Sequence, residues 1–449
     1  MLWFVGAALV FRLAIVLGWH QSGGDGLQYF QLAQELRRAG RFSYGADQPL
    51  SYSRLPGYPL FLAATVSPGH PLSLENHVFW AALENLLLDL GTALAVFGVL
   101  RRRGLRGAWL GLLMTLLCPT LWLVSSFAMT ESLSTFLGTL LLYLAVRATE
   151  TRPLIFAAAA GAVTGLALLV RADAITFVPG ALVLLAALPA RRVQAMAAFG
   201  AAALAVFAPW PIRNQLRFGA PHFAATGWRD MDGEPLGNGP FEWARTWSRS
   251  RPGDAWFEIV MANHARLEPQ RPGVLIPDMF DDAAERERLM RLFWRYSSVK
   301  LTPEVDQAFH DLAVERRARH PFHYFVTLPL QRMARLWSPV PEWETPMNLR
   351  WLGLPALRPV MGWLDRLLFA LALAGAVIGW RRGQRPLVGA FLACLVARTL
   401  LYGWAIPHVT CGRYLVEAFP TLIVLAAIAL TQRASGEQTR QQRQAILPP

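Results

Sequence analysis

Long apolar runs recur along the chain at a length that suits helices crossing a bilayer. A hydrocarbon core of about 30 Å requires roughly 20 apolar residues in a helix. About ten such runs are present, near 2–19, 77–100, 107–125, 130–146, 154–170, 174–190, 193–210, 361–380, 386–404 and 412–431. The pattern predicts an all-α integral membrane protein with about ten transmembrane helices.

Arginines occupy every second connection between these runs. They stand at 101–103, 147–152, 191–192, 381–382 and 433–443. This alternation is expected of correctly counted spans, because basic residues favour the cytoplasmic side. The first run has no basic start and no small-residue cleavage site, so we expect it to be retained as a span.

The alternation predicts four regions. They are an N-terminal transmembrane module over 1–210 with a first outer loop at 20–76, an extracytoplasmic region over 211–360, C-terminal transmembrane helices over 361–431 and a disordered cytoplasmic tail over 432–449.

The two outer segments differ in their pattern. Residues 26–38 have an apolar stripe and a polar back, which predicts a helix lying in the membrane interface. The segment 211–360 has mixed polarity and is expected to be mainly helical. Within it, Thr302-Pro303-Glu304 predicts a helix start and His320-Pro321 predicts a stop.

Composition supports the membrane class. Of 449 residues, 54% are hydrophobic and 16% are charged, whereas soluble domains carry about a quarter charged residues. The net charge of +13 comes mainly from arginines placed between apolar runs, which favours lipid contact and topology over nucleic-acid binding. Three cysteines cannot build a disulfide framework. The chain contains no nucleotide-binding signature, and its histidines have no metal-ligand spacing.

Candidate chemistry lies in the first outer loop. Asp25 follows the first apolar run, and Arg54 precedes the turn Pro56-Gly57-Tyr58-Pro59. An acid and an arginine at the membrane surface are placed where a lipid phosphate and a polar acceptor can meet.

These residues belong to a series of short stretches in which the sequence resembles the GT-C superfamily of polyprenyl-phosphate-sugar-dependent glycosyltransferases. The resemblance is to the family 39-like branch, which contains protein O-mannosyltransferases and the lipid A aminoarabinose transferase. The order of the stretches within a many-span layout is the specific feature. They are Asp25 with Tyr29, Arg54-Leu55-Pro56-Gly57-Tyr58-Pro59-Leu60, Thr130-Glu131, Pro209-Trp210-Pro211-Ile212-Arg213-Asn214, and Arg413-Tyr414 before Pro420.

The resemblance implies that Asp25 is the general base that takes a proton from the acceptor as it attacks the anomeric carbon. An inverting displacement needs one carboxylate near the attacking atom and cations near the departing phosphate. The structural alternative for Asp25 is an N-cap of the helix at 26–38, and capping is compatible with catalysis.

For Arg54 the resemblance implies a grip on the lipid phosphate, which suits a guanidinium. The alternative is an arginine that reaches lipid headgroups. Ser53 and Gln28 stand where some relatives carry charged residues, so a divalent metal is not supported. The only small-molecule requirement expected is the lipid-linked sugar donor.

Further residues are expected to bind substrate: Tyr29, Tyr58, Glu131, Arg171, Arg213, Asn214, Arg413 and Tyr414. The structural alternatives are a helix cap at Glu131, an ion pair of Arg171 with Asp173, an interfacial anchor at Arg213, and a pair of Arg413 with Glu417.

Together these features predict a membrane glycosyltransferase that moves a single sugar from a polyprenyl-phosphate carrier to an extracytoplasmic lipid, glycan or protein. Membrane lipids are expected partners and nucleic acid is not. The expected location is a bacterial inner membrane, with the active site facing the periplasm. The rival interpretation is a polytopic lipid or sugar transporter or flippase, which predicts inverted repeats that the sequence does not show. A non-enzymatic envelope scaffold would have no need of Asp25.

Overall fold

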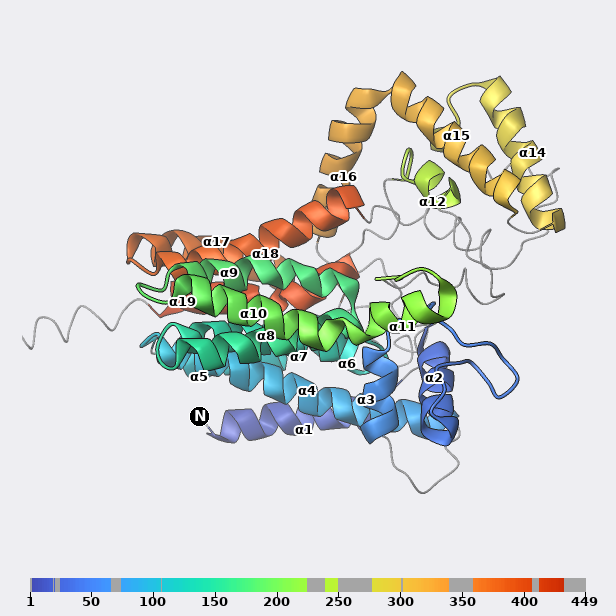
Figure 1. The fold of residues 1–449 in the computed structure, drawn as a ribbon. Coiled ribbons are helices and arrows are strands. Elements are labelled where there is room, and N and C mark those ends of the chain that lie inside the picture. The colour runs from blue at the N-terminus through green and yellow to red at the C-terminus, as the bar shows by residue number, and fades with distance from the viewer. Residues whose placement is uncertain are drawn as a thin grey trace, which may run out of the picture. The chain divides into compact units, whose positions relative to one another are not determined.

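The all-α class is confirmed. A computed structural model of the protein describes residues 2–18, 20, 25–65, 74–105, 107–223, 239–248, 277–299, 302–338, 358–405 and 412–431. Over these ranges every named element is a helix (Figure 1), and an isolated β-bridge joins Ser43 and Leu50. The predicted tail at 432–449 lies outside the described residues.

The chain divides into two compact units. The first comprises Met1–Ala225, Ala356–Ala397 and Val416–Pro449. The second comprises Thr226–Pro355 and Arg398–Leu415.

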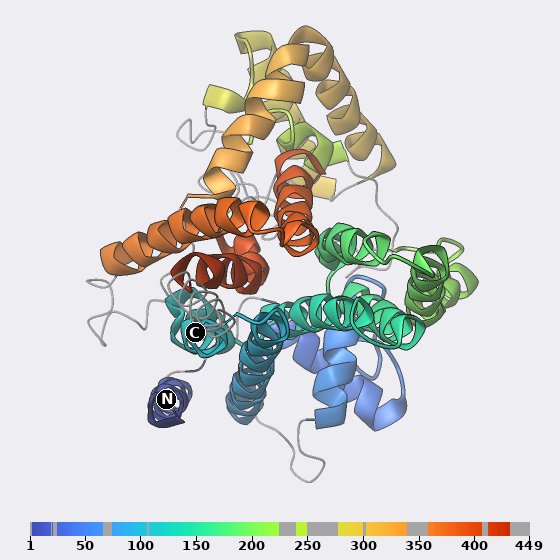
Figure 2. The same cartoon turned by 90° about the vertical axis from the view of Figure 1, so that its left-hand side faces the viewer.

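The helices of the first unit follow the apolar runs of the sequence. α4, α7, α8 and α10 run side by side (Figures 1 and 2), and α17 packs on α19. Short 3-10 segments precede two of the helices, η1 (Ala172–Phe177) before α9 and η10 (Gly412–Ala418) before α19. The helices are α1 (Leu2–Gly18), α4 (Leu74–Arg102), α5 (Ala108–Leu117), α6 (Pro119–Ser125), α7 (Glu131–Ala148), α8 (Pro153–Val170), α9 (Val178–Ala186), α10 (Arg192–Phe207), α11 (Pro209–Phe218), α17 (Arg358–Arg381), α18 (Arg385–Leu400) and α19 (Phe419–Leu430).

Several of these helices are suited to a membrane. Five described helices pass by length and apolarity, and the bent pair α5–α6 adds a sixth candidate span if the two helices are counted as one. The remaining apolar runs form shorter or less apolar helices. The chain is therefore a membrane protein, and the count of about ten spans stays a prediction. Five described helices are long and apolar enough to cross: His77–Arg102, Pro153–Val170, Arg192–Phe218, Pro359–Arg381 and Arg385–Trp404.

Buried polar contacts tie the apolar helices together. Arg12 on α1 forms an ion pair with Asp89 on α4, and its guanidinium donates to the Ser125 hydroxyl at 3.0 Å. Thr120 on α6 donates to the carboxylate of Asp365 on α17 at 3.2 Å. Because ionisable groups are costly within a bilayer, such partners fix which helices become neighbours.

The second unit has a small aromatic core. Trp243 packs between Phe293 and Phe309, with both pairs of ring centroids 5.6 Å apart. The predicted helix start is confirmed, because the Thr302 hydroxyl accepts from the Val305 N–H at 3.4 Å, and that helix ends before His320 as predicted. The elements are α12 (Gly239–Ala244), η4 (Pro277–Met279), α14 (Ala283–Val299), α15 (Pro303–Arg319), η5 (His323–Thr327), α16 (Leu328–Leu336) and η8 (Leu401–Ala405).

Candidate active site

The first outer loop contains two helices joined by an irregular segment. α2 (Gly26–Ala39) occupies the predicted range and ends at Gly40, whose φ of 64° suits a glycine cap. α3 (Gly57–Thr65) begins at the predicted turn. A Cβ atom at Gly57 would lie 2.7 Å from the backbone of Leu169 on α8, so this position requires glycine. The location of α2 in the membrane interface stays a prediction.

Arg54 joins the end of the irregular segment to the start of α2. Its Nη2 atom donates to Oδ1 of Asp25 at 2.6 Å, and its Nε atom donates to Oε1 of Gln28 at 2.8 Å. The Asp25 side chain is 41% exposed and the Arg54 side chain 12%. Asp25 occupies the N-cap position of α2 but makes no side-chain capping bond. Its carboxylate is therefore oriented by Arg54 rather than by the helix end.

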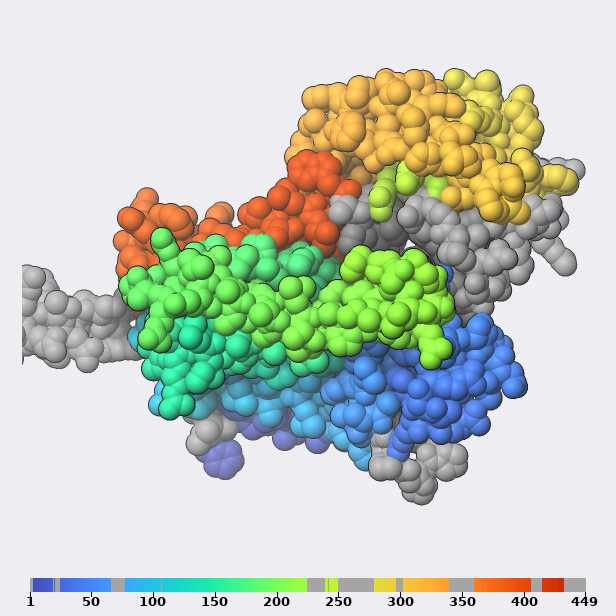
Figure 3. Space-filling model, in the orientation of Figure 1, coloured from blue at the N-terminus to red at the C-terminus, as the bar shows by residue number. Residues whose placement is uncertain are grey.

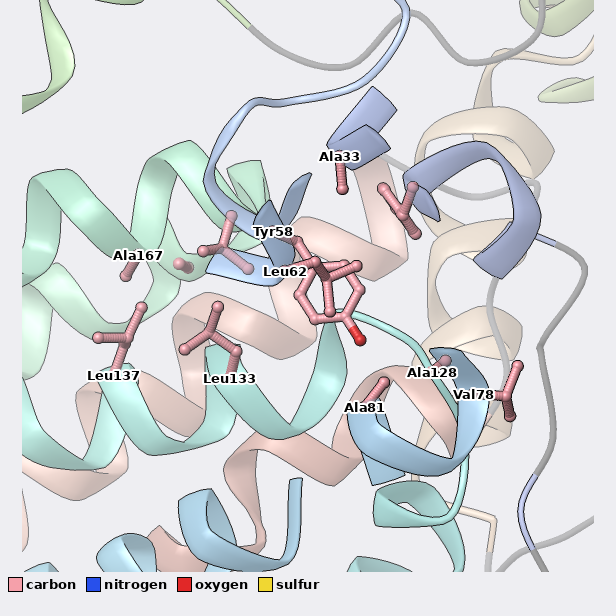
Figure 4. Close-up of a cluster of buried hydrophobic side chains, with 12 residues drawn as sticks. Ala33, Tyr58, Leu62, Val78, Ala81, Ala128, Leu133, Leu137 and Ala167 are labelled. Atoms are coloured by element: carbon pink, nitrogen blue, oxygen red, sulfur yellow. The ribbon is translucent and has the colours of Figure 1, made fainter. Parts of the chain in front are cut away.

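Two tyrosines extend the site inward from this pair. The rings of Tyr29 and Tyr58 meet edge to face with centroids 5.2 Å apart, and the Arg54 guanidinium carbon lies 5.4 Å from the Tyr29 centroid. Figure 4 shows Tyr58 in the centre of an apolar cluster to which α2, α3, α4, α7 and α8 contribute. The buried Tyr58 hydroxyl has no hydrogen-bond partner among the described residues.

Tyr29 lies within electrostatic reach of four charged residues. Burial raises the pKa of its phenol to about 12, and Arg54, Asp25, Arg171 and Glu131 also act on that pKa. The phenol is therefore protonated at neutral pH and able to donate a hydrogen bond. Tyr29 thus connects the Asp25–Arg54 pair with the charges around Arg171.

Arg171 gathers three buried carboxylates from separate elements. Its guanidinium nitrogens lie 2.7 Å from Glu417 of η10, 3.0 Å from Asp173 of η1 and 3.4 Å from Glu131 of α7. It also donates to the Thr130 hydroxyl at 3.0 Å. The expected pair with Asp173 is present, but it is part of a larger group. Buried groups of this kind often position ligands, and they are weak evidence for stability.

The helix-cap alternative for Glu131 is not what the structure shows. Thr130 occupies the N-cap position of α7 and makes no side-chain capping bond. The Glu131 carboxylate is buried and pairs with Arg171 instead.

Arg213 fastens α11 to the loop that carries Arg54. Its Nη1 atom donates to the Ser51 carbonyl at 2.8 Å and to Oδ1 of Asn214 at 2.7 Å. The guanidinium carbon also lies 4.9 Å from the Trp210 ring centroid and 5.0 Å from that of Phe218. The half-buried side chain therefore holds specific contacts to the loop and to aromatic rings, which is more than the interfacial-anchor alternative requires.

A groove of about 420 Å³ opens beside this contact. In Figure 3 the surface of α11 meets that of the first outer loop. Arg213 and Arg217 contribute two cations to the lining. The apolar lining includes Leu36, Phe42, Leu50, Leu60, Leu169 and Trp210. A groove with an apolar floor and arginines suits a molecule with a long chain and an anionic head.

Hydroxyl groups that the sequence motifs did not single out hold the irregular segment in place. The Ser53 hydroxyl bonds with those of Tyr44 and Ser51, and the pKa of the Tyr44 phenol is raised by burial. Gln28 was noted only as a departure from relatives, yet it orients Arg54. The cluster of hydroxyl residues in Ser51-Tyr52-Ser53, directly before Arg54, is the signal that could have found them.

The structure thus brings together Asp25, Tyr29, Arg54 and Tyr58 with the Arg171–Glu131 group. Arg213 and Asn214 lie on α11, where Arg213 contacts the same loop at Ser51. Tyr414 belongs to the second unit, where its carbonyl accepts from Nε of Arg398. The Arg413 side chain lies outside the described residues. Within the described ranges, no group of three histidine, cysteine, aspartate or glutamate side chains could hold a metal ion.

Comparisons by sequence found no match to a family model or to a curated protein. Solved structures do match over the full chain. The oligosaccharyltransferase of Archaeoglobus fulgidus, tethered with an acceptor peptide containing the NVT sequon, is 14% identical with a TM-score of 0.50, covering 99% of this chain and 51% of that one. ArnT from Cupriavidus metallidurans bound to undecaprenyl phosphate is 15% identical with a TM-score of 0.42, covering 100% of this chain and 81% of that one.

The likeness to the oligosaccharyltransferase shows a shared fold. The sequence motifs and the comparison thus agree at the level of the fold. The chain spans about half the length of that enzyme, and the comparison shows the shared fold.

Proposed function

We propose that this protein is a membrane glycosyltransferase that moves a single sugar from a polyprenyl-phosphate carrier to an acceptor outside the cytoplasm. The observation that carries the proposal is the Asp25–Arg54 pair. The pair holds a partly exposed carboxylate against a largely buried guanidinium, beside the buried Tyr29 ring.

Asp25 is the general base in this proposal. The acceptor oxygen or nitrogen attacks the anomeric carbon, the bond from that carbon to the phosphate oxygen breaks, and the acceptor proton passes to the Asp25 carboxylate. One Asp25 oxygen bonds with Arg54, and the second makes no hydrogen bond with any described residue, so it is available for that proton. A single displacement of this kind inverts the anomeric centre.

Arg54 stabilises the charge that the leaving phosphate acquires. A guanidinium has five N–H donors, and the hydrogen bonds of Arg54 to Asp25, Gln28 and the Tyr44 phenol use three of them. Donors therefore remain for phosphate oxygens while the pair stays intact. The cation then serves both the base and the leaving group.

The groove beside α11 supports a lipid-linked donor. Its apolar lining suits a polyprenyl chain, and Arg213 and Arg217 are placed for the phosphate end. Glu131 and Arg171 are proposed to hold hydroxyl groups of the sugar, and Tyr29 to donate from its protonated phenol. No bound metal takes part, and the reaction occurs at the periplasmic face of a bacterial inner membrane.

The test is transfer by the full chain in lipid nanodiscs, where transport across a sealed membrane cannot be the readout. A panel of radiolabelled polyprenyl-phosphate sugars is incubated with the protein and an envelope fraction, and label leaving the lipid carrier is measured. We expect transfer from one donor, loss of transfer in Asp25→Asn, and full transfer in the matched control Asp47→Asn, an exposed acid of the same loop. Absence of transfer from every donor, despite transport in sealed vesicles, would support the transporter interpretation.

A further inference from the structure

A strip of large apolar side chains is exposed on the second unit. Phe322 is 72% exposed, Phe325 55% and Leu330 58%, with the partly exposed Val326 between them. The strip lies on a continuous helical segment that begins just before η5 and runs through α16 (Figure 1). η5 is a π-helical turn, so the face is defined by exposure rather than by a fixed period: these four side chains are exposed, whereas Leu328, Arg332 and Leu336 are buried.

The opposite face of this segment packs within its own unit. Leu328 and Leu336 are fully buried. Arg332 donates to the carbonyl of Ser248 at 2.9 Å and to that of Arg245 at 2.7 Å. The core around Trp243 includes no residue of the strip. The second unit is therefore held together by the other side of the segment, and the strip is left for a different environment.

Trp404 fixes the depth of the strip. It is the last residue of the candidate span Arg385–Trp404, and its indole N–H donates to the carbonyl of Phe325 at 3.0 Å. A second indole bond, from Trp337 to the Thr399 hydroxyl at 3.0 Å, holds the end of α16 to the same span. Tryptophans at the ends of spans lie in the membrane interface. A backbone bonded to Trp404 must lie at that level too.

We propose that the strip formed by Phe322, Phe325, Val326 and Leu330 inserts into the bilayer leaflet in which Trp404 ends, and so anchors the second unit to the membrane surface. Helices with one apolar face lie in the interface with that face about 5–10 Å into the headgroup and acyl boundary. The occupant is lipid, because the bond to Trp404 fixes the strip at the level of the membrane interface, where an exposed apolar face meets headgroups and acyl chains. The inference does not depend on sugar transfer.

The test is site-directed spin labelling of the full chain in nanodiscs made of phosphatidylethanolamine and phosphatidylglycerol. Labels are attached to Val326→Cys or Leu330→Cys after the three native cysteines are replaced by serine. Collisions with oxygen, which partitions into lipid, are compared with collisions of a water-soluble nickel chelate. The matched control is Val314→Cys, an exposed apolar position on α15 outside the strip.

We expect labels at 326 and 330 to collide more frequently with oxygen than with nickel chelate, and the label at 314 to show the reverse. Preference for the chelate at 326 and 330 would overturn the proposal in favour of water. Poor access of both reagents would overturn it in favour of a protein contact. If the cysteine-free chain does not fold, Phe325→Asp and Val314→Asp are compared in the native background. Phe325→Asp should lower the melting temperature in nanodiscs further than Val314→Asp, and equal shifts would contradict the proposal.

Discussion

At the scale of single residues, the site depends on a contact between positions that are distant in sequence. Asp25 and Arg54 are separated by 29 positions, and their side chains meet at 2.6 Å. The sequence suggested each residue separately, through its place in a motif. It could not predict that Arg54 also holds Gln28, or that Glu417 pairs with Arg171, because both contacts depend on how distant segments pack.

Replacements of Arg54 by alanine and by lysine distinguish the effect of its positive charge on donor binding from the effect of its planar hydrogen-bonding geometry. We expect Arg54→Ala to weaken donor binding about 10- to 100-fold, because a charge-assisted hydrogen bond to phosphate contributes roughly 1.5–3 kcal/mol. Arg54→Lys should restore only part of that loss, since an ammonium cannot reproduce the planar fork. Binding is measured by titration with a polyprenyl-phosphate analogue. Arg37→Ala, an exposed arginine on α2, is the control, and unchanged binding in Arg54→Ala would remove this residue from the donor site.

Tyr29 gives a prediction about pH. Burial raises the pKa of its phenol to about 12, so the protonated form persists below that value and is lost only above it. Tyr29→Phe should therefore reduce the transfer rate by the same factor from about pH 6 to about pH 10. Rates of both proteins are measured across this range. A ratio of rates that changes with pH would show that Tyr29 titrates within it.

At the scale of elements, helix positions were predictable and their neighbours were not. The range of α2 and the helix start at Thr302 follow from stripes and caps, which are local properties. The carboxylates around Arg171 come from α7, η1 and η10. The hydrophobic periodicity of the sequence does not predict that these three elements lie next to one another. The loop between α2 and α3 was equally hidden, since its shape depends on hydroxyl contacts and on Arg213 of α11.

The ion pair between Arg12 on α1 and Asp89 on α4 should matter for stability mainly because neither charge is left buried without a partner. We expect Asp89→Asn to lower the free energy of unfolding by about 3–5 kcal/mol, because it leaves Arg12 charged and buried without its partner. The double variant Arg12→Leu with Asp89→Leu should recover most of that loss. Unfolding in detergent is measured for both. A double variant that is no more stable than Asp89→Asn would contradict this account of the pair.

At the scale of the whole molecule, composition and apolar runs predicted the membrane class and the all-α fold, and a solved oligosaccharyltransferase shares the fold of this chain. The number of membrane spans was harder to predict from the sequence, because apolar runs interrupted by proline form short or bent helices such as α5–α6. The division into two units was not expected in detail. It assigns Arg398–Leu415 to the second unit, although apolarity alone groups these residues with the C-terminal spans.

Metal dependence is a property of the complete enzyme. The proposed chemistry needs a carboxylate and arginines, and no bound cation. We expect transfer by the full chain to be unchanged when a chelator is added to the nanodisc assay. A rate that falls with chelator and is restored by one divalent ion would show that the leaving phosphate needs a metal as well as Arg54.

The most direct test of the central claim is the single-turnover rate of Asp25→Asn with the donor already bound. We expect the rate to fall by about 10²–10⁴-fold, the usual contribution of a general base, while the dissociation constant of the donor stays within about twofold, or roughly 0.4 kcal/mol. An unchanged rate would show that Asp25 is not the base. A rate that is restored by saturating donor would assign Asp25 to binding instead.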